Sequence, residues 1–270
     1  MMVDPSDRPA VGPYQLTREL PDHQLGARWV ALHESDQTSH LVYLIPRLDR
    51  PVRERALAAL GLIQAFSNPH ILRVERFGPD SARRLWVVCP YPGDTDGLLT
   101  LGRLLRDKGG QMSQDEAERA TLQLLEALEA AHRAGLGNGP ILIDDVLVDR
   151  HGSLLLELYG VARAVAGDRE PATDLGREEV RSIAEIAYQL ITGLRAEAPL
   201  IPASRLVKKL DPAWAAWLRT ALDPLGGFAG PADAISALPS RRPRPEPRRP
   251  IVHVRTVLGR LASPAGPDER

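Results

Sequence analysis

The sequence predicts an α+β fold in which a small β-rich part precedes a larger helical part. Up to Tyr91 the apolar residues fall in short runs of strand length, interrupted by one Ala- and Leu-rich stretch of helical character. After Pro92 the apolar residues recur at helical spacing in long segments that carry capping signals. We therefore expect one part at 13–91 and a second part at 92–239.

The bulk composition is that of an ordinary globular protein. The chain has 270 residues, 43% hydrophobic and 26% charged, which is enough for a sizeable core in one or two domains. A formal net charge of -1 argues against a protein that binds nucleic acid over its whole surface. The single cysteine, Cys89, excludes an internal disulfide framework and indicates a reducing compartment. With neither a secretory signal nor an apolar run of membrane-spanning length, we expect a cytoplasmic protein, and the richness in Ala, Leu, Arg and Pro favours a bacterial source.

The first part contains five predicted strands and one predicted helix. Residues 1–12 are expected to form a flexible leader. Alternation of apolar and polar residues and the positions of Pro and Gly predict the other elements. They are two strands in Pro13–His33 around a turn at Pro21–Asp22, a strand from His40, a helix at Arg53–Phe66, and strands in "HILRVERFG" and "RRLWVVCPY".

The second part is dominated by helices. The clearest follows Ser113, which with Glu116 has the pattern of a capping box, and it ends before Gly135. A hairpin of two short strands is expected within Gly135–Arg163. Further helices are predicted in 176–193, 210–224 and 230–238.

A basic, proline-rich tail is expected at residues 240–270. The stretch "RRPRPEPRRP" holds five arginines and four prolines, and proline removes backbone donors and favours an extended chain. The sequence therefore predicts a disordered tail apart from a helical turn around Val254–Leu261. Two roles stay open for it: a solvated linker, or a contact with nucleic acid or an anionic membrane.

The order of these elements and several short motifs resemble a protein kinase domain of the bacterial serine/threonine type, over residues 13–239. The motifs that carry the resemblance are "LPDHQLGARWVALH", "SNPHILRVERFG", "LWVVCPYPG", "ALEAAHRAGL", "LYGVAR", "EVRSIAEIAYQLITG" and "LRTALDP" with "GPADAISAL". The resemblance implies a protein kinase-like two-lobed fold, with a small β-rich N-lobe and a larger helical C-lobe.

The nucleotide-binding positions that the resemblance implies are degenerate. In the glycine-rich loop, whose backbone N–H groups approach the phosphates, the first two glycines correspond to Pro21 and His23, and only Gly26 is retained. The phosphate-binding lysine corresponds to Leu44, or to Ile45 if the match shifts by one residue. The hinge beside the adenine corresponds to Cys89 and Tyr91. The lysine's glutamate partner falls near Ala59 or Leu60, and the nearest acid is Glu54.

The catalytic positions are degenerate as well. The family's His-Arg-Asp triplet corresponds to Asn138, Gly139 and Pro140, so Pro140 replaces the catalytic aspartate and Leu142 the lysine beyond it. The Asp-Phe-Gly triplet corresponds to Leu158, Tyr159 and Gly160, and leucine offers magnesium no oxygen ligand. Asp145 replaces the metal-binding asparagine.

The segment for substrate docking is short. Glu179 corresponds to the buried aspartate of the central helix and follows Leu158 by only 21 positions, with no Ala-Pro-Glu triplet between them. We therefore interpret the chain as a pseudokinase, a regulatory or scaffolding module that binds a protein partner, with no cofactor, no metal site and no ATP–magnesium binding expected. The alternatives are an atypical nucleotide-binding or phosphotransfer enzyme that uses Asp145, and a peripheral structural protein docked by its tail.

Several single residues admit a functional and a structural interpretation. Asp144 and Asp145 are a candidate metal pair or two solvated acids of a turn. Cys89 is a candidate reactive thiol, but no lysine or histidine lies near it in the sequence, which favours a buried inert one. Trp214 and Trp217 lie three apart on one helix face, where core packing is the simpler interpretation.

Overall fold

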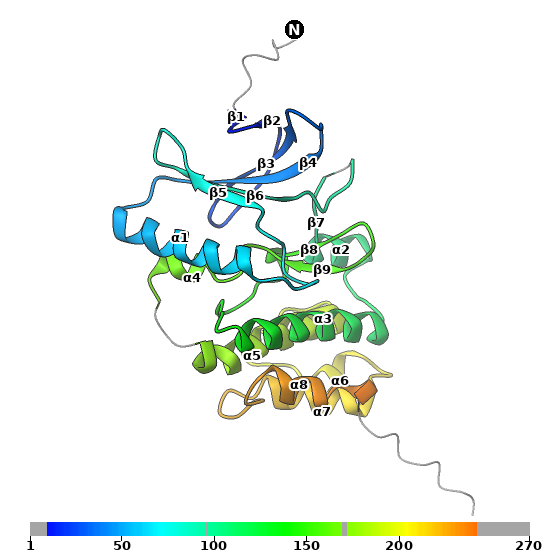
Figure 1. Ribbon diagram of the computed structural model, residues 1–270. Coiled ribbons are helices and arrows are strands. Elements are labelled where there is room, and N and C mark those ends of the chain that lie inside the picture. Colours follow the sequence, from blue (N-terminus) through cyan, green and yellow to red (C-terminus); the bar gives the residue numbers. More distant parts are fainter. Residues whose placement is uncertain (1–9, 96, 169–171, 242–270) are drawn as a thin grey trace, which may run out of the picture.

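The computed structural model describes residues 10–95, 97–168 and 172–241. The N-lobe comprises β1–β6 with α1, and the C-lobe comprises β7–β9 with α2–α8 (Figure 1). The α+β fold with a small β-rich lobe and a larger helical lobe, as predicted from the sequence, is therefore confirmed. Of the expected leader, residues 1–12, positions 1–9 lie outside the described residues, and of the expected tail, residues 240–270, positions 242–270 do. Ser240 and Arg241, which the sequence assigned to the disordered tail, belong to a short 3-10 turn, Pro239–Arg241.

One antiparallel sheet builds the N-lobe. Its strand order is β1-β2-β3-β4-β6-β5, and α1 lies beside it (Figure 1). The bounds are β1 Ala10–Val11, β2 Tyr14–His23, β3 Gly26–His33, β4 Ser39–Ile45, α1 Arg50–Ala65, β5 Arg76–Pro79 and β6 Leu85–Pro90.

The N-lobe differs from the sequence prediction at three places. Ala10 and Val11, assigned to the leader, pair with Gln15 and Tyr14 as β1. The turn predicted at Pro21–Asp22 is wrong, because β2 continues to His23 and the chain turns after it. The β2–β3 register shifts between Leu20 and His23, and a shift of this kind tolerates a proline that has no N–H to donate.

The third difference concerns the strand predicted from His70. The strand begins only at Arg76, and the residues from His70 to Leu72 pair with the C-lobe instead. Leu72 N–H donates to the Leu156 carbonyl at 2.9 Å, and Leu156 N–H donates to the His70 carbonyl at 3.0 Å. This segment therefore joins the two lobes.

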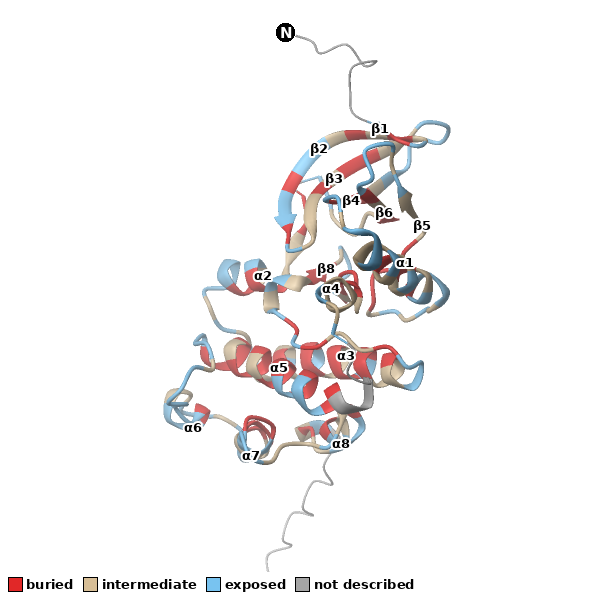
Figure 2. Cartoon of the chain, turned by 90° about the vertical axis from the view of Figure 1, so that its left-hand side faces the viewer, coloured by how far each residue is buried: buried red, intermediate tan, exposed pale blue. Residues whose placement is uncertain are grey.

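The C-lobe is built around two long helices that pack against each other, α3 and α5. Figure 2 shows buried residues concentrated on both. The capping box of α3 is confirmed, since Ser113 Oγ accepts from Glu116 N–H and Glu116 Oε2 accepts from Ser113 N–H. The bounds are β7 Leu99–Thr100, α2 Leu101–Asp107, α3 Gln114–Arg133, β8 Val146–Val148, β9 Leu154–Leu156, α4 Val161–Ala166, α5 Ala172–Thr192, α6 Ala203–Leu206, α7 Pro212–Ala221 and α8 Pro231–Ser236.

The hydrophobic core has two parts. The larger one runs through both lobes and includes Trp214 and Trp217, which pack edge to face with ring centroids 5.5 Å apart and are core residues. The smaller one covers the outer face of the N-lobe sheet, where Trp29 and Trp86 pack against it. Successive residues of a strand point to opposite faces of the sheet. Residues of β4 that belong to this second cluster therefore point away from the other lobe, and their neighbours along the strand point toward it.

Candidate functional site: the cleft between the lobes

A buried ion pair spans the two lobes. Arg28 projects from β3, and its Nη1 lies 3.0 Å from both carboxylate oxygens of Glu157, which follows β9. Both side chains are almost wholly excluded from solvent. Arg28 Nε also donates to the Pro21 carbonyl at 2.6 Å, so the same guanidinium holds the end of β2.

Tyr43 completes this arrangement. It lies opposite Arg28 in the β3–β4 register, and its hydroxyl donates to Glu157 Oε1 at 2.6 Å. Burial raises the pKa of Glu157, and the positive charge of Arg28 opposes that rise. Burial, followed by the charge of Glu157, raises the pKa of Tyr43 well above its ordinary value. A charge taken out of water is tolerated only with such partners, so the three side chains form one interdependent unit, the Arg28–Glu157–Tyr43 triad.

The turn after β2 also contacts the C-lobe. Gln24 Nε2 donates to Asp145 Oδ2 at 3.4 Å, and His23 Nε2 lies 4.0 Å from Asp145 Oδ1. Because Nδ1 of His23 accepts from Leu25 N–H, the proton of the neutral ring lies on Nε2, which is buried without a hydrogen-bond partner.

These groups titrate away from their ordinary values. Burial, helped by the charge of Arg28, lowers the pKa of His23 to about 4. Burial raises the pKa of Asp145, and the neighbouring charge of Asp144 adds to the rise. His23 is therefore neutral near pH 7.

The space left between these side chains is very small. The cavity beside His23, Asp145, Glu157 and Leu158 has a volume of about 10 Å³. That is roughly the volume that one water molecule needs. The cleft between the lobes is closed here by side chains of the chain itself.

The residues predicted to correspond to the glycine-rich loop help to close the cleft between the lobes. Pro21 and His23 contact Arg28 and the C-lobe as described above. Gly26 has a positive φ of 147°, and a Cβ there would lie 2.2 Å from the Leu44 carbonyl oxygen. The packing of β3 on β4 is therefore sufficient to require a glycine at this position, without any phosphate.

The structure does not bring Leu44 to the cleft. Leu44 packs with the outer cluster of the N-lobe, and Ile45 lies in the main core. The residue of β4 that faces Glu157 is Tyr43. On α1, Leu60 is buried in the core, Ala59 packs against it, and Glu54 is exposed and paired with Arg50 at 2.8 Å.

The structure separates the other predicted catalytic positions. Leu158 lines the small cavity, is 2% exposed, and adopts a positive φ of 39°, which is uncommon for a residue with a Cβ. Pro140 is exposed, and Leu142 is 60% exposed, so neither packs into the cleft. Asp145 is the one acid of this set that lines the cavity.

The predicted hinge is tied to β2. Cys89 is fully buried, and burial raises the pKa of its thiol well above its ordinary value, which agrees with an inert side chain. Arg18 of β2 donates to the Tyr91 hydroxyl at 3.3 Å and to the Thr95 carbonyl at 3.0 Å. These exposed contacts bring β2 and the hinge segment together at a second point.

Asp144 and Asp145 have different surroundings. Asp144 accepts from the Thr100 hydroxyl at 3.1 Å and packs on Gly102, where a Cβ would lie 2.2 Å from its Oδ1. Asp145 faces the cleft instead. Within the described part of the chain, no group of three or more His, Cys, Asp and Glu side chains has a metal-binding arrangement.

Glu179 of α5 anchors the loop that precedes the hairpin. Its Oε1 accepts from the backbone N–H groups of Asn138 and Gly139 at 2.5 and 2.7 Å, and its Oε2 accepts from the Tyr159 hydroxyl at 3.2 Å. His132 of α3 contacts the same carboxylate. Asn138 Oδ1 in turn accepts from Gly160 N–H at 2.7 Å, so a single buried acid organises the loop and the start of α4.

Arg28, Tyr43 and Glu157 were not among the site residues predicted from the sequence. Their signal was nevertheless present in the sequence, because Arg28 and Glu157 are single charges of opposite sign inside apolar runs, "GARWVALH" and "LLLELYG". A charge inside a strand of this kind requires a buried partner. Nothing local, however, identified each as the partner of the other.

Similar proteins support the fold. No family model matches the chain. It is 30% identical over 113 residues to a probable cell division protein kinase of Encephalitozoon cuniculi, 33% identical over 129 residues to the serine/threonine-protein kinase PknK of Mycobacterium tuberculosis, and 28% identical over 265 residues to a putative cyclin-dependent kinase F-2 of Oryza sativa. These matches cover 42%, 47% and 88% of this chain, and 34%, 11% and 78% of the relatives.

A solved structure shows the same architecture. The PknI kinase domain of Mycobacterium tuberculosis superposes with a TM-score of 0.69 at 19% identity, over 86% of this chain and 98% of that domain. The chain thus has the fold of a protein kinase-like domain. In the described residues, no helix is long and apolar enough to cross a membrane.

Proposed function

We propose that this kinase-like chain is a pseudokinase, a catalytically inactive module that regulates or scaffolds other proteins through its surface. The observation that carries the proposal is the Arg28–Glu157–Tyr43 triad between the lobes, next to a cavity of only about 10 Å³. Catalysis of phosphoryl transfer depends on charged groups and metal ions placed around the phosphates. Here Arg28 is buried and bonded to Glu157, and the cavity beside the pair has room for about one water molecule.

The local geometry supports an assignment of the family's lysine position to Tyr43, rather than to Leu44 or Ile45. Tyr43 projects from the same strand toward the residue that precedes Leu158, as a phosphate-binding lysine would need to do. A phenol with a raised pKa is neutral and offers a phosphate no charge. Leu158, at the metal position, offers no oxygen ligand.

The segment after Leu158 also supports inactivity. It forms the short helix α4, which packs against α1, and Arg55 Nε of α1 donates to the Ala164 carbonyl at 3.0 Å. Arg163 pairs with Asp168 at 3.1 Å. A segment held in this way does not provide an open platform for a peptide substrate.

The first experiment is a thermal shift titration of the full chain with ATP and magnesium, beside an active serine/threonine kinase as the positive control. Each charged contact to a phosphate contributes about 1.5–3 kcal/mol, and the loss of two weakens binding by roughly a hundredfold or more. A ligand that binds only the folded state raises the melting temperature, so no shift is expected at millimolar nucleotide.

The opposite result favours the atypical enzyme. A magnesium-dependent shift, with transfer of label from ATP that disappears in Asp145→Ala, would overturn the pseudokinase proposal. Asp145→Asn serves as the matched variant, because it preserves the size of the side chain and removes only the charge.

The proposed regulatory or scaffolding role requires a separate experiment. Cross-linking mass spectrometry of the full chain in its source cell should give cross-links to a defined protein that fall on the exposed faces of the lobes. Cross-links within this chain only would contradict an interaction role.

A further inference from the structure

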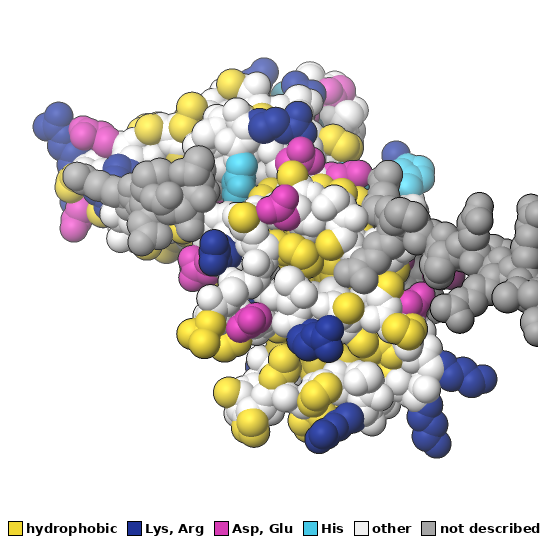
Figure 3. Space-filling model, turned by 90° about the horizontal axis from the view of Figure 1, so that it is seen from below, with side chains coloured by type: hydrophobic (Ala, Val, Ile, Leu, Met, Phe, Trp, Pro, Cys, Tyr) yellow, Lys and Arg dark blue, Asp and Glu magenta, His cyan; other side chains and the backbone are white. Residues whose placement is uncertain are grey.

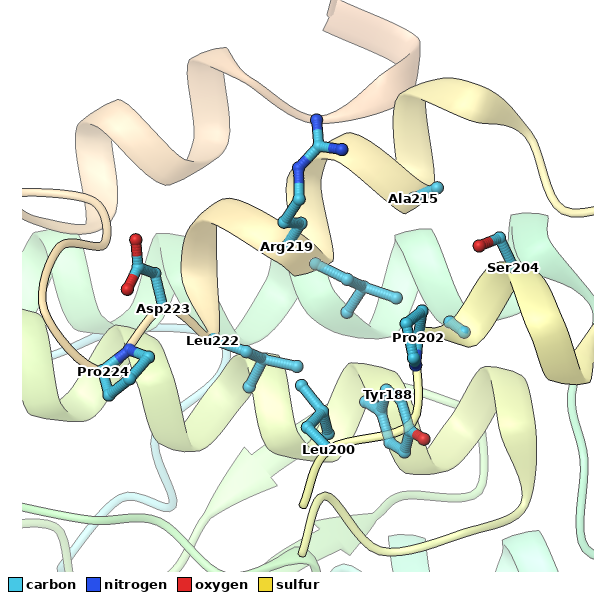
Figure 4. Close-up of a pocket in the computed structure, with 11 residues that line it drawn as sticks. Tyr188, Leu200, Pro202, Ser204, Ala215, Arg219, Leu222, Asp223 and Pro224 are labelled. Carbon is cyan, nitrogen blue, oxygen red and sulfur yellow. The ribbon is translucent and has the colours of Figure 1, made fainter. Parts of the chain in front are cut away.

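An open groove lies in the C-lobe, away from the cleft. It is formed by α5, α6 and α7 with the loop before α6, and it has a volume of about 450 Å³ (Figure 4). Its centre is apolar, because Leu200, Pro202 and Leu222 converge there, whereas the charged ends of Arg219 and Asp223 extend away from it (Figure 4). We call this the α6–α7 groove. The closure of the cleft does not involve it.

Apolar side chains surround this groove in unusual number. Among the described residues six large hydrophobic side chains are exposed, and four of them, Leu194, Leu200, Ile201 and Leu225, belong to the groove or to the segments next to it. A second hollow of about 450 Å³ adjoins it and shares Tyr188, whose hydroxyl already donates to the Ile201 carbonyl. Figure 3 shows hydrophobic side chains across the face seen from this end of the molecule. Exposed apolar area of this kind marks a docking surface.

The chain itself supplies a segment of matching chemistry. In "IVHVRTVLGRL", residues 251–261, the apolar residues Ile251, Val254, Leu258 and Leu261 recur at helical spacing and the segment holds no acid. As a helix it would present one apolar stripe, with Arg255 beside it and with His253 and Arg260 toward the opposite side. An amphipathic helix with such anchors is the usual ligand of an apolar groove.

The described chain ends where this segment can reach the groove. The last turn, Pro239–Arg241, packs on α7, the helix that also lines the groove. Nine residues, 242–250, connect it to Ile251 and are rich in proline, so an extended connection spans roughly 28 Å at about 3.1 Å per residue. The ten-residue helix α7 is only about 15 Å long. Any point along α7 is therefore within reach.

The charges along the connection from Arg241 to the groove favour docking of the segment. The exit of the chain is bordered by Asp115, Glu118 and Asp211, and Ser240 N–H donates to Glu118 Oε1 at 2.7 Å. The connecting residues carry four arginines and one glutamate. At the groove, Asp223 Oδ1 accepts from Leu225 N–H at 3.0 Å, and the carboxylate makes no ion pair within the described residues, so an arginine of the segment can pair with it.

We propose that residues 251–261 dock as an amphipathic helix in the α6–α7 groove of the same chain. The segment then covers a surface that a protein partner with a similar helix would otherwise occupy. Partner binding at this surface would require displacement of the segment.

Engineered disulfides in the full chain test this. In such a helix Val257 would lie at the rim of the apolar stripe. Ser204 is an exposed residue of the groove. Air oxidation of Ser204→Cys/Val257→Cys should give an intramolecular disulfide, detected by mass and by mobility on non-reducing gels. Ser236→Cys/Val257→Cys is the matched control, because Ser236 is equally a surface serine of the C-lobe and lies nearer to Arg241 in the chain. The native Cys89 is buried and does not compete.

Two further variants separate docking from random encounter. Leu258→Asp on the apolar stripe should slow formation of the Ser204 disulfide about tenfold, since it removes the burial of one leucine. Thr256→Asp, on the opposite side of the helix, should leave the rate unchanged. The proposal would be overturned if the Ser204 and Ser236 pairs formed their disulfides at equal rates. It would also be overturned if Leu258→Asp left the rate of the Ser204 disulfide unchanged. A disulfide-linked dimer whose yield rises with protein concentration would overturn it in favour of a second copy.

Discussion

Arg28 and Glu157 are 129 positions apart in the chain, yet they form the buried ion pair that connects the N-lobe to the C-lobe. Glu157 also lines the small cavity between the lobes. The pair therefore connects the two lobes at this cavity, and its two charges compensate each other there.

The triad should be strongly coupled. Arg28→Met leaves Glu157 buried without its counter-ion, and we expect the free energy of unfolding to fall by about 3–5 kcal/mol. Tyr43→Phe, which removes one hydrogen bond, should cost about 1–2 kcal/mol. Arg28→Met combined with Glu157→Gln should be less destabilised than the sum of the single variants, measured by urea unfolding in a double-mutant cycle. Additive effects would contradict a coupled unit.

Stability should fall as the solution is acidified, through His23. Its pKa lies near 4 in the folded state, below the ordinary value of 6.5, so the unfolded chain binds the proton more readily. The stabilisation is fully present above about pH 6.5 and is lost as the pH falls toward 4. We expect a loss of about 1–3 kcal/mol over this range, because nearby Asp145 partly stabilises the protonated ring. Urea unfolding at several pH values should show that the free energy of unfolding depends less on pH in His23→Gln than in the unsubstituted protein. An identical pH dependence in the two proteins would exclude His23 as the responsible titrating group.

An aspartate at position 158, which the family resemblance assigns to metal binding, should destabilise the protein. Leu158→Asp places a second carboxylate beside Glu157 in a closed cavity, and we expect a loss of about 2–4 kcal/mol. Leu158→Asn is the control, because asparagine tolerates the positive φ and carries no charge. The stability of each variant is measured by thermal unfolding with and without magnesium. Stabilisation of Leu158→Asp by magnesium would show that the cleft can open to a metal.

Gly26 should be required for folding rather than for ligand binding. In Gly26→Ala the Cβ would overlap the Leu44 carbonyl, and we expect a loss of about 2–4 kcal/mol by chemical unfolding. Gly12 also has a positive φ, but a Cβ added there would have no atom within 4 Å. We therefore expect Gly12→Ala to lose only about 1 kcal/mol. Similar losses at both positions would show that backbone conformation, and not the contact with β4, is the cause.

Much of the fold could be predicted because its elements are encoded locally. The capping box of α3 and the apolar periodicity of α3, α5 and α7 depend on residues a few positions apart. Of the short helices α8 was predicted, whereas α2, α4 and α6 were not, because segments of four to seven residues hold few apolar repeats from which a period can be recognised. Their positions are decided by packing.

The site could be predicted only in part. The sequence indicated that Pro21, His23 and Leu158 stand at positions of interest, and all three lie at the cleft. It did not reveal that Tyr43 rather than Leu44 faces Glu157, because that depends on which face of β4 is turned inward. The partnership of Arg28 with Glu157 follows from how the lobes meet, which no local pattern specifies.

The tryptophans have a spectroscopic consequence. All four are accounted for: Trp29 and Trp86 pack on the outer N-lobe sheet, and Trp214 and Trp217 are buried in the C-lobe. Each lobe thus carries its own pair of intrinsic fluorophores in a distinct environment. Replacing one pair with phenylalanine leaves emission that reports on the opposite lobe, so the melting of the two lobes can be followed separately in an otherwise unlabelled protein.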